Sequence, residues 1–306
     1  TGWLRADRAE AVAKAVAEAT AVYDLQFAEP AEDEIPPSVM ENMAFAAPYE
    51  AVTEMYSRPK IGSLDPSFMM APWHFIFFFF FLSDAGYGLV LTILLFIVLK
   101  VLKPEGGAGK LVTVIFLGSI STIFWGAMFG GWFGLEFNPI LLSPMNEPLK
   151  MLALCFGLGA AHIILGVCMK MYLEIKRGQI WNAIFDQLSW LVIFAGLGLI
   201  GFMPDTQVGK YLALSGMTVI ILTGGRDKKN ILRRLLGGVL SLYNFSGYFS
   251  DLLSYSRLFA LGLSTGVIAM VINTIAHMLW QAGPVGIVIA IVFLLLGHTF
   301  NIAVNI

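Results

Sequence analysis

The sequence predicts an all-α polytopic membrane protein with about eight membrane helices, which include a broken N-terminal hairpin and two long tilted C-terminal helices. Of its 306 residues, 58% are hydrophobic and 13% are charged, whereas about a quarter of the residues in a soluble domain are charged. The mean hydropathy is +0.77. Apolar segments follow one another from residue 72 to the end of the chain. No basic patch interleaved with aromatic residues indicates a nucleic-acid partner.

Residues 1–62 form the predicted soluble part, which we expect to close a larger cytoplasmic domain. Residues 7–20 predict an amphipathic helix, residues 24–28 a possible strand, and the acidic, proline-rich residues 29–37 a loop. The N-terminus is charged and lacks the apolar run of a signal peptide. Because the chain opens without Met, we expect it to be a piece of a longer protein.

The membrane domain, residues 63–306, contains seven apolar segments. They span residues 72–102, 111–134, 149–173, 184–202, 208–223, 235–280 and 284–306. Three connecting loops are basic, with Lys100, Lys103 and Lys110, then Lys176 and Arg177, then Arg226, Lys228, Lys229, Arg233 and Arg234. They alternate with loops that carry Glu136, Glu147, Asp205 and Gln281. The positive-inside rule places the basic loops, and both termini, in the cytoplasm.

This orientation requires an even number of crossings before Lys100, yet only residues 72–102 are available. That segment is long for one span of about 20 residues and short for two. It contains a break, Ser83 to Gly88, so we predict a broken hairpin with helices at 73–83 and 86–102. Asp84 is expected to cap the second helix through backbone N–H groups. The alternative role for Asp84 is a proton relay.

Small residues recur at four-residue spacing in two segments. Gly126, Gly130 and Gly134 in one, and the set Ala153, Gly157 and Ala161 in the other, predict faces for close helix packing. The two cysteines, Cys155 and Cys168, share one apolar segment and are interpreted as buried thiols without disulfide or metal spacing. No metal site or cofactor is expected.

Arg257 lies in the middle of the long apolar stretch 235–280. A guanidinium does not lose its proton, and at mid-membrane it costs about 2.5–3.5 kcal/mol on insertion scales. Six residues at alternating spacings of three and four share its helix face: Gly247, Ser250, Ser254, Arg257, Leu261 and Ser264. This small, hydroxylic face predicts contact with another helix or with water. The alternative is that Arg257 snorkels to an interface.

Two further polar stripes lie near the end of the chain. One consists of Asn273, His277 and Gln281, the other of His298, Asn301 and Asn305. One interpretation is interhelical hydrogen bonding. The other is that the stripes line aqueous vestibules at opposite ends of a path past Arg257.

Four motifs resemble a known family. They are FFFFFLSDAGYG at 77–88, FWGAMFGGWFG at 124–134, SYSRLFALGLS at 254–264 and GHTFNIAVN at 297–305. In this order they resemble the membrane subunit of rotary ATPases of the vacuolar/archaeal type, called subunit a or subunit I. Residues 1–62 resemble the end of the cytoplasmic arm that holds the peripheral stalk.

The resemblance implies a stator in a prokaryotic cell membrane, with two half-channels that carry H⁺ or Na⁺ to and from a rotating proteolipid ring (c or K). Arg257 matches the essential cation that separates them. A second arginine of the family lies on the eighth helix, and its position is expected after Ile306. The implied partners are the proteolipid ring, the peripheral stalk, the central-stalk subunit (d or C) and the lipid bilayer. Asp251 and the serines of the Arg257 face join the predicted ion path.

ATP hydrolysis is expected elsewhere in such a complex, because this chain contains no GxxxxGK[ST] motif and no catalytic site is predicted in it. A stand-alone secondary ion transporter is one alternative function, but that class favours inverted repeats with matched broken helices, and only one break is evident. A structural membrane anchor is the other alternative, but an anchor needs neither Arg257 nor the polar stripes.

Overall fold

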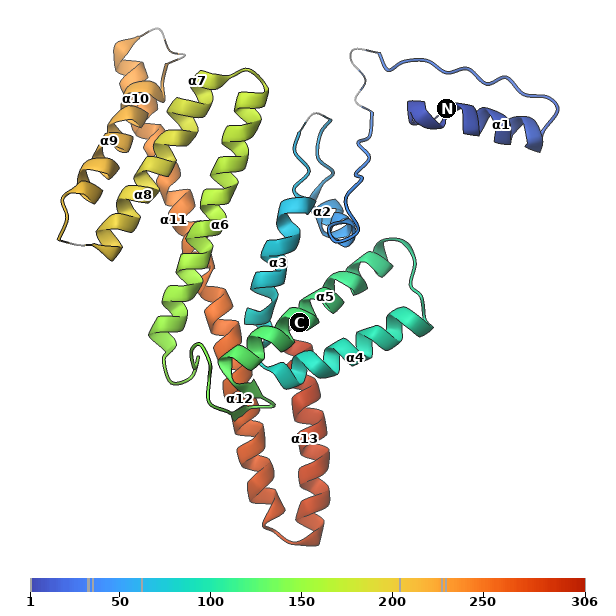
Figure 1. The fold of residues 1–306 in the computed structure, drawn as a ribbon, viewed down its shortest axis with the longest axis vertical. Helices are drawn as coiled ribbons and strands as arrows, with labels where there is room; N and C mark the ends of the chain where they lie inside the picture. Colours follow the sequence, from blue (N-terminus) through green and yellow to red (C-terminus); the bar gives the residue numbers. More distant parts are fainter. Residues whose placement is uncertain are drawn as a thin grey trace.

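The computed structural model describes residues 2–31, 34, 36–61, 63–203, 205–226, 228 and 230–305. Lys229 of the third basic loop lies outside the described residues. Among the described residues, five helices are long and apolar enough to cross a membrane, and three shorter apolar helices accompany them. The all-α polytopic membrane fold is therefore confirmed, and the chain is an integral membrane protein (Figure 1).

The N-terminal part begins with η1 (Ala6–Arg8) and α1 (Ala9–Ala19), which lie away from the other helices at the end of an extended segment (Figure 1). The described residues of the predicted loop 29–37 adopt no regular structure. The strand predicted at 24–28 was wrong, because this segment has no neighbouring strand to pair with.

Short helices connect this part to the membrane helices. They are η2 (Ala47–Tyr49) and α2 (Glu50–Tyr56), and Ala46 and Tyr49 pack against Ala71 and Val114. Glu50 Oε2 lies 2.6 Å from Lys110 Nζ, and Glu50 Oε1 accepts hydrogen bonds from Asn42. This ion pair holds Glu50, in the predicted soluble part, beside Lys110 of the first basic loop.

The predicted break in the first hairpin is present. Helix α3 (Ser67–Leu82) ends before Ser83, whose φ of 42° is left-handed, and α4 (Ala85–Val101) begins after Asp84. Asp84 Oδ1 accepts the N–H groups of Gly86 and Tyr87 at 2.9 and 3.1 Å, so Asp84 is the N-cap of α4. Helix α4 then packs along α5 (Gly106–Phe129) (Figure 1).

The prediction that Gly126, Gly130 and Gly134 share one helix face was wrong. Helix α5 ends at Phe129, and Gly130 and Gly134 adopt left-handed φ values of 75° and 73°. Glycine is favoured there because it lacks a Cβ. Gly134 lies between two short strands, β1 (Gly131–Trp132) and β2 (Leu135–Glu136). Within α5 itself, Gly126 provides close helix contact, because a Cβ there would meet the Ala85 nitrogen at 2.4 Å.

Helix α6 (Pro148–Lys176) also differs from the prediction. Ala153, Gly157 and Ala161 are exposed in this chain. The face of α6 that packs inside the chain carries Cys155 and Gly159. A glycine is needed at position 159 because the ring of Tyr255 lies directly against it. Cys155 is a buried free thiol, and Cys168 is half-buried and free. Spacing identified small residues but not the direction in which they face.

The next helices form a compact group. They are α7 (Ile180–Asn182), the π-helical segment η3 (Ala183–Leu188), α8 (Ser189–Phe202) and α9 (Val208–Thr223). Helices α8 and α9 approach closely where Gly196 meets Ala213: a Cβ at Gly196 would lie 2.5 Å from the Ala213 nitrogen. Arg226, just after α9, binds Asp186 of η3 through both carboxylate oxygens, at 2.9 and 2.6 Å.

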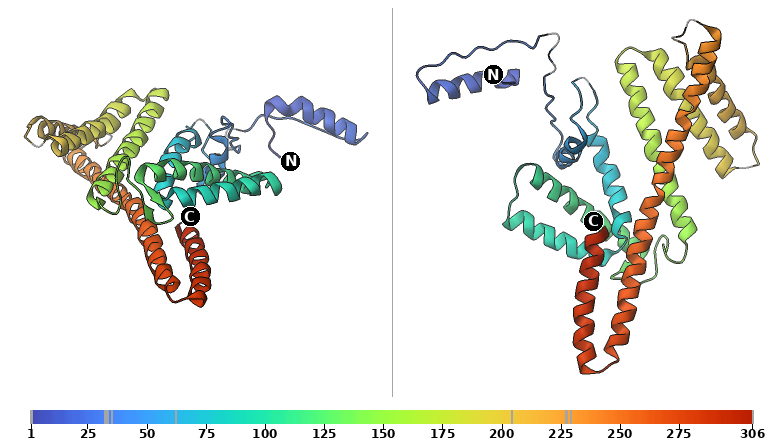
Figure 2. Two further views of the ribbon diagram at one scale, coloured as in Figure 1. Left: turned by 60° about the horizontal axis from the view of Figure 1, so that its bottom comes forward. Right: turned by 180° about the vertical axis from the view of Figure 1, so that it is seen from behind.

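The long segment is nearly one continuous helix. It is divided into α10 (Ile231–Leu242), α11 (Asn244–Ser254) and α12 (Ser256–Trp280) only at Tyr243 and Tyr255, both of which keep right-handed helical φ and ψ. Leu232–Trp280 thus spans 49 residues. Helix α13 (Pro284–Asn305) returns antiparallel to α12, and both extend beyond the other helices (Figure 2).

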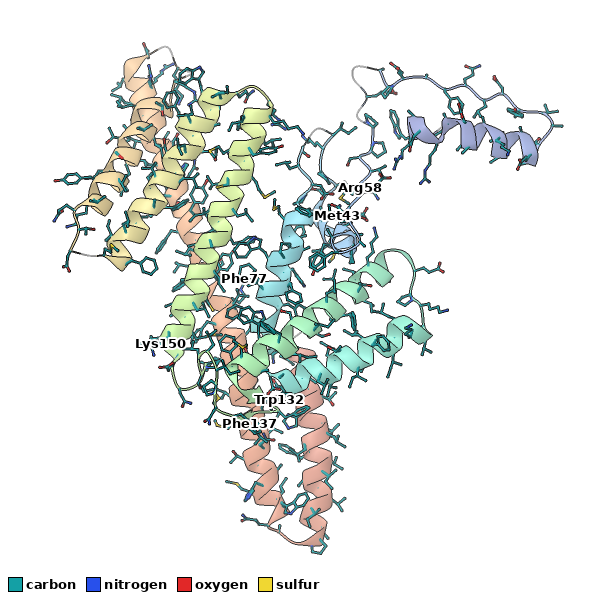
Figure 3. All side chains as sticks on the ribbon, viewed as in Figure 1. Met43, Arg58, Phe77, Trp132, Phe137 and Lys150 are labelled. Atoms are coloured by element: carbon teal, nitrogen blue, oxygen red, sulfur yellow. The ribbon has the colours of Figure 1, made fainter. Side chains whose placement is uncertain are left out.

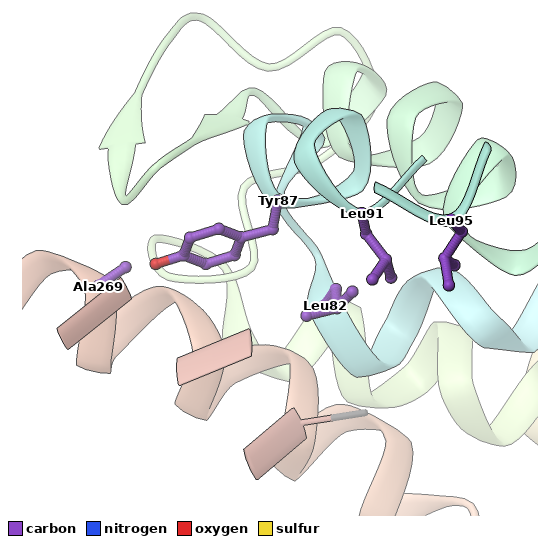
Figure 4. Close-up of a cluster of buried hydrophobic side chains, with 5 residues drawn as sticks. All are labelled: Leu82, Tyr87, Leu91, Leu95 and Ala269. Carbon is purple, nitrogen blue, oxygen red and sulfur yellow. The ribbon is translucent and has the colours of Figure 1, made fainter. Parts of the chain in front are cut away.

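The α5–α6 connection passes α12, where a Cβ at Gly134 would meet the Ala269 side chain at 2.5 Å. Figure 3 shows Trp132 and Phe137 on this connection. Tyr87 reaches the same place from α4, with its ring directed toward Ala269 (Figure 4). The break after α3, the β-hairpin and α12 therefore meet at one point.

We expect Lys103 and Glu147 to lie on opposite sides of the membrane, because α5 separates them. The measurement is labelling of Lys103→Cys and Glu147→Cys with a membrane-impermeant thiol reagent in oriented vesicles, after Cys155 and Cys168 have been replaced. Arg177→Cys is the control and should label from the same side as Lys103→Cys. Labelling of Lys103→Cys and Glu147→Cys from one side would contradict the predicted topology.

Replacing Asp84 with Asn should destabilise the protein by about 2–4 kcal/mol, because an amide offers one acceptor oxygen and no charge to the buried N–H groups. Thermal unfolding in detergent measures the change. The control is Asp205→Asn in the exposed α8–α9 connection, which should change stability by no more than about 0.5 kcal/mol. Equal stability of the two variants would remove Asp84 from its capping role.

Candidate functional site

Arg257 is the second residue of α12 and lies on the exposed face of the long helix. No hydrogen bond or ion pair joins its guanidinium to any described residue. Two acidic residues that were possible partners are engaged elsewhere: Asp186 binds Arg226, and Asp84 binds backbone N–H groups. A cation that costs free energy in hydrocarbon is thus left without a partner among the described residues.

The rest of the Arg257 face is similarly open. Gly247, Ser250 and Ser254 are exposed, whereas Leu261 and Ser264 are half-buried. The hydroxyls of Ser254 and Ser264 donate to carbonyls of their own helix, Ser250 O at 3.0 Å and Leu261 O at 2.8 Å. Asp251 is exposed beside them. We call these seven residues, 247, 250, 251, 254, 257, 261 and 264, the arginine face.

The opposite side of the helix is anchored at Tyr255. Its hydroxyl lies 2.6 Å from His162 Nδ1 of α6, and its ring covers Gly159. Phe77 of α3 approaches the same ring, with centroids 5.5 Å apart. Leu258 packs against the buried cluster that contains Phe80. These contacts fix the rotation of the helix, so that Arg257 points away from the chain.

A chain of hydrogen bonds joins the two polar stripes. Asn273 donates through Nδ2 to Phe133 O at 2.7 Å, so its Oδ1 accepts from His298 Nε2 at 3.1 Å. The donating Nε2 fixes the histidine tautomer, and Nδ1 therefore accepts from the Tyr87 hydroxyl at 2.6 Å. Asn301 donates to the Tyr87 oxygen and to Thr265 O, each at 3.0 Å.

These contacts correct one expectation. The stripes do not lie at opposite ends of a path, because Asn273 and His298 touch each other. Asn301 and Asn305 are buried and hydrogen-bonded to each other, so they line no open vestibule within this chain. Interhelical hydrogen bonding is the interpretation that fits these residues. His277 and Gln281 are exposed near the α12–α13 turn, with their side-chain nitrogens 3.3 Å apart.

Asp84 is saturated with hydrogen bonds. Besides capping α4, it accepts N–H groups from Phe133 through Oδ1 at 2.8 Å and from Gly134 through Oδ2 at 2.9 Å. Four backbone donors hold the carboxylate, which favours its structural role over a proton relay. No group of three His, Cys, Asp or Glu side chains with the arrangement of metal ligands occurs among the described residues.

Sequence reasoning missed several residues that build this region. Tyr87, His162, Tyr255 and Thr265 were not chosen as partners, although Tyr87 and Tyr255 lie inside motifs that were noted. A lone tyrosine in an apolar run indicates only that its hydroxyl needs a hydrogen-bond partner when the residue is buried. Which partner it finds depends on how helices cross, and one sequence does not contain that information.

Comparison with known proteins shows one consistent group of relatives. No family model matches the chain. The A-type ATP synthase subunit I of Methanocaldococcus jannaschii is 30% identical over 341 aligned positions, which cover 98% of this chain and 49% of the relative. For subunit I of Pyrococcus horikoshii the identity is 31%, over 99% of this chain and 48% of the relative. The V-type ATP synthase subunit I of Borreliella burgdorferi is 29% identical, over 100% of this chain and 54% of the relative.

The family resemblance seen in the four motifs is therefore confirmed, over nearly the whole chain. The chain spans about half the length of these curated relatives.

The Tyr87–Asn301 contact should be measurable by a double-mutant cycle. We expect Asn301→Leu to destabilise the protein by about 1–3 kcal/mol, because the buried Tyr87 hydroxyl loses a donor. Combined with Tyr87→Phe, the change should deviate from additivity by about 0.5–3 kcal/mol. The control pairs Asn301→Leu with Thr218→Val on exposed α9, where additivity should hold. Additivity in both pairs would show that the contact contributes nothing.

Proposed function

We propose that this chain, a relative of subunit I of the A-type and V-type ATP synthases, is the membrane part of the stator of a rotary ATPase. The observation that carries the proposal is Arg257, an exposed cation without a partner in the described chain, in the middle of a small and polar helix face. Such a face needs a partner outside the chain, and a ring of proteolipid helices that carry carboxylates supplies the opposite charge.

The charge accounts for ion release. A ring carboxylate that faces lipid has to be neutral, either protonated or bound to Na⁺. As it rotates to Arg257, the fixed cation favours the ionised carboxylate, so the bound ion leaves. The same charge repels any second cation that would pass directly between the two aqueous paths. Arginine suits this role better than lysine because it does not lose its proton.

Two half-channels are proposed along the arginine face, one toward each side of the membrane. Ser250, Asp251 and Ser254 lie on the side of Arg257 toward the basic loops. Beyond Arg257 in the other direction, Ser264 and then the exposed pair His277 and Gln281 continue along α12. The bonds between Asn273 and His298 and between Asn301 and the Thr265 carbonyl hold α12 and α13 together beside this path. Asn305 in turn bonds to Asn301 of its own helix.

The remaining partners follow from the same proposal. Residues 1–62 are the end of the domain that binds the peripheral stalk, and the central-stalk subunit contacts the cytoplasmic side of the complex. ATP is hydrolysed or made on other subunits.

The two alternative functions are less well supported. A stand-alone secondary transporter does not account for the relatives, which are subunits of ATP synthases. A structural anchor does not need an unpaired arginine, whose presence in a membrane helix costs free energy.

Replacing Arg257 with Ala should abolish ATP-driven ion uptake while the complex still assembles. The ring carboxylate would then lose the charge that favours its ionised form, and passive ion leak should rise. Arg257→Lys should restore uptake poorly. The measurement is uptake into vesicles together with an assembly assay on the same membranes.

The matched control is Arg177→Ala in the exposed α6–α7 connection, which removes a cation outside the arginine face and should leave uptake unchanged. Normal uptake by an assembled Arg257→Ala complex would falsify the proposal.

A further inference from the structure

A polar cavity of about 280 Å³ lies at the end of the helix group that carries Arg177 and Arg226. Helix α6, the π segment η3, and helices α8 to α11 surround it. The residues that define its chemistry are Lys170, Glu174, Asp186, Gln187, Trp190 and Tyr248. The cavity is separate from the arginine face, and the proposed function makes no use of it.

Two oxygen atoms in this cavity need a hydrogen-bond donor. Glu174 Oε2 and Gln187 Oε1 are buried, and neither has a partner among the described residues. The Gln187 side chain is 3% exposed. A buried acceptor without a donor is costly, and more so when it is charged. Asp186 is already neutralised by Arg226, so Glu174 supplies the uncompensated negative charge.

The backbone is adapted to this cavity. Residues Ala183–Leu188 form a π-helical turn between α7 and α8. Such turns are rare and are frequent at functional sites. Because a π turn adds a residue to the helix, it changes the direction of the side chains it contains. Both Asp186 and Gln187, which line the cavity, lie in this turn.

Aromatic rings form another wall. Phe185, Trp190 and Tyr248 line the cavity, and the Trp190 and Tyr248 rings lie 4.9 Å apart. Aromatic faces attract cations. Rings, a free carboxylate oxygen and a free amide oxygen together suit an ammonium group. The two oxygens require N–H donors, which a primary ammonium has and a quaternary ammonium lacks.

The residues around the cavity are typical of the depth of lipid headgroups. Large aromatic residues near it are exposed: Tyr172 at 56%, Trp181 at 69% and Tyr243 at 75%. Tyrosine and tryptophan concentrate at the membrane–water interface, and basic residues mark one side of it. Lys170 is exposed and lines the cavity, where its ammonium can meet a phosphate.

We propose that this cavity binds the headgroup of a phospholipid with a primary ammonium, of the phosphatidylethanolamine type. The ammonium donates to Glu174 and Gln187 between the aromatic rings, and Lys170 binds the phosphate. The lipid stabilises the group of helices behind the arginine face.

The experiment is native mass spectrometry of the purified full-length protein in its complex, after exchange into nanodiscs with equal amounts of phosphatidylethanolamine and phosphatidylcholine. The wild-type protein should retain the ethanolamine lipid at least about tenfold better. Glu174→Gln, which keeps the shape and removes the charge, should abolish the preference, and Gln187→Leu should reduce it. The matched control, Glu147→Gln at the far end of α6, should keep it.

Each of the following outcomes would overturn the proposal. Equal retention of both lipids by the wild-type protein indicates a water-filled cavity. Displacement of the lipid by millimolar free ethanolamine indicates a site for small amines instead of lipids. An unchanged preference in the folded Glu174→Gln variant would show that the lipid binds elsewhere. Lys170→Gln tests the phosphate contact: it should weaken retention, whereas stronger retention would show that Lys170 itself occupies the ammonium position.

Discussion

The arrangement of the membrane helices depends on the carboxylate of Asp84. Four backbone N–H groups from two distant segments converge on it. It begins α4 after the break that follows α3, and it holds the β-hairpin at Phe133 and Gly134. In a membrane, irregular backbone is tolerated only where its polar groups are satisfied inside the protein. A carboxylate satisfies several donors at once, so the chain can break and turn here without exposing them to lipid.

From this point the contacts lead to α12 and α13. The carbonyl of Phe133 accepts from Asn273, and Tyr87, just after the cap, bonds to His298 and Asn301. Each polar group on this side of α12 therefore has a partner. The contrast with the other side is informative: the arginine face has serines bonded only to their own helix and a cation bonded to no described residue. One side of the helix has its polar partners within the chain, and the other is the side that we propose a partner subunit to cover.

The sequence predicts structure best where a residue would cost free energy in most environments, such as a charge or a polar break inside an apolar segment. The break at Ser83–Asp84 is such a case, and the structure confirms it. Arg257 is another: it is exposed on the long helix, and its role in ion transport stays a prediction. The small residues were less informative. Gly130 ends a helix instead of continuing it, and Gly157 faces away from the chain, because a glycine is compatible with several backbone states and with either side of a helix. The Tyr255–His162 and Tyr87–His298 pairs join residues far apart in sequence, so their meeting depends on helix crossings that local patterns do not contain.

The central claim is that the arginine face of α11 and α12 lies against a ring of proteolipid helices. Disulfide cross-linking in the assembled complex tests it most directly. A cysteine at Ser254 should cross-link to a cysteine placed beside the ring carboxylate, whereas a cysteine at Leu214, exposed on α9, should not. Cross-linking from Leu214 and none from Ser254 would contradict the account, because the ring would then face another side of the chain.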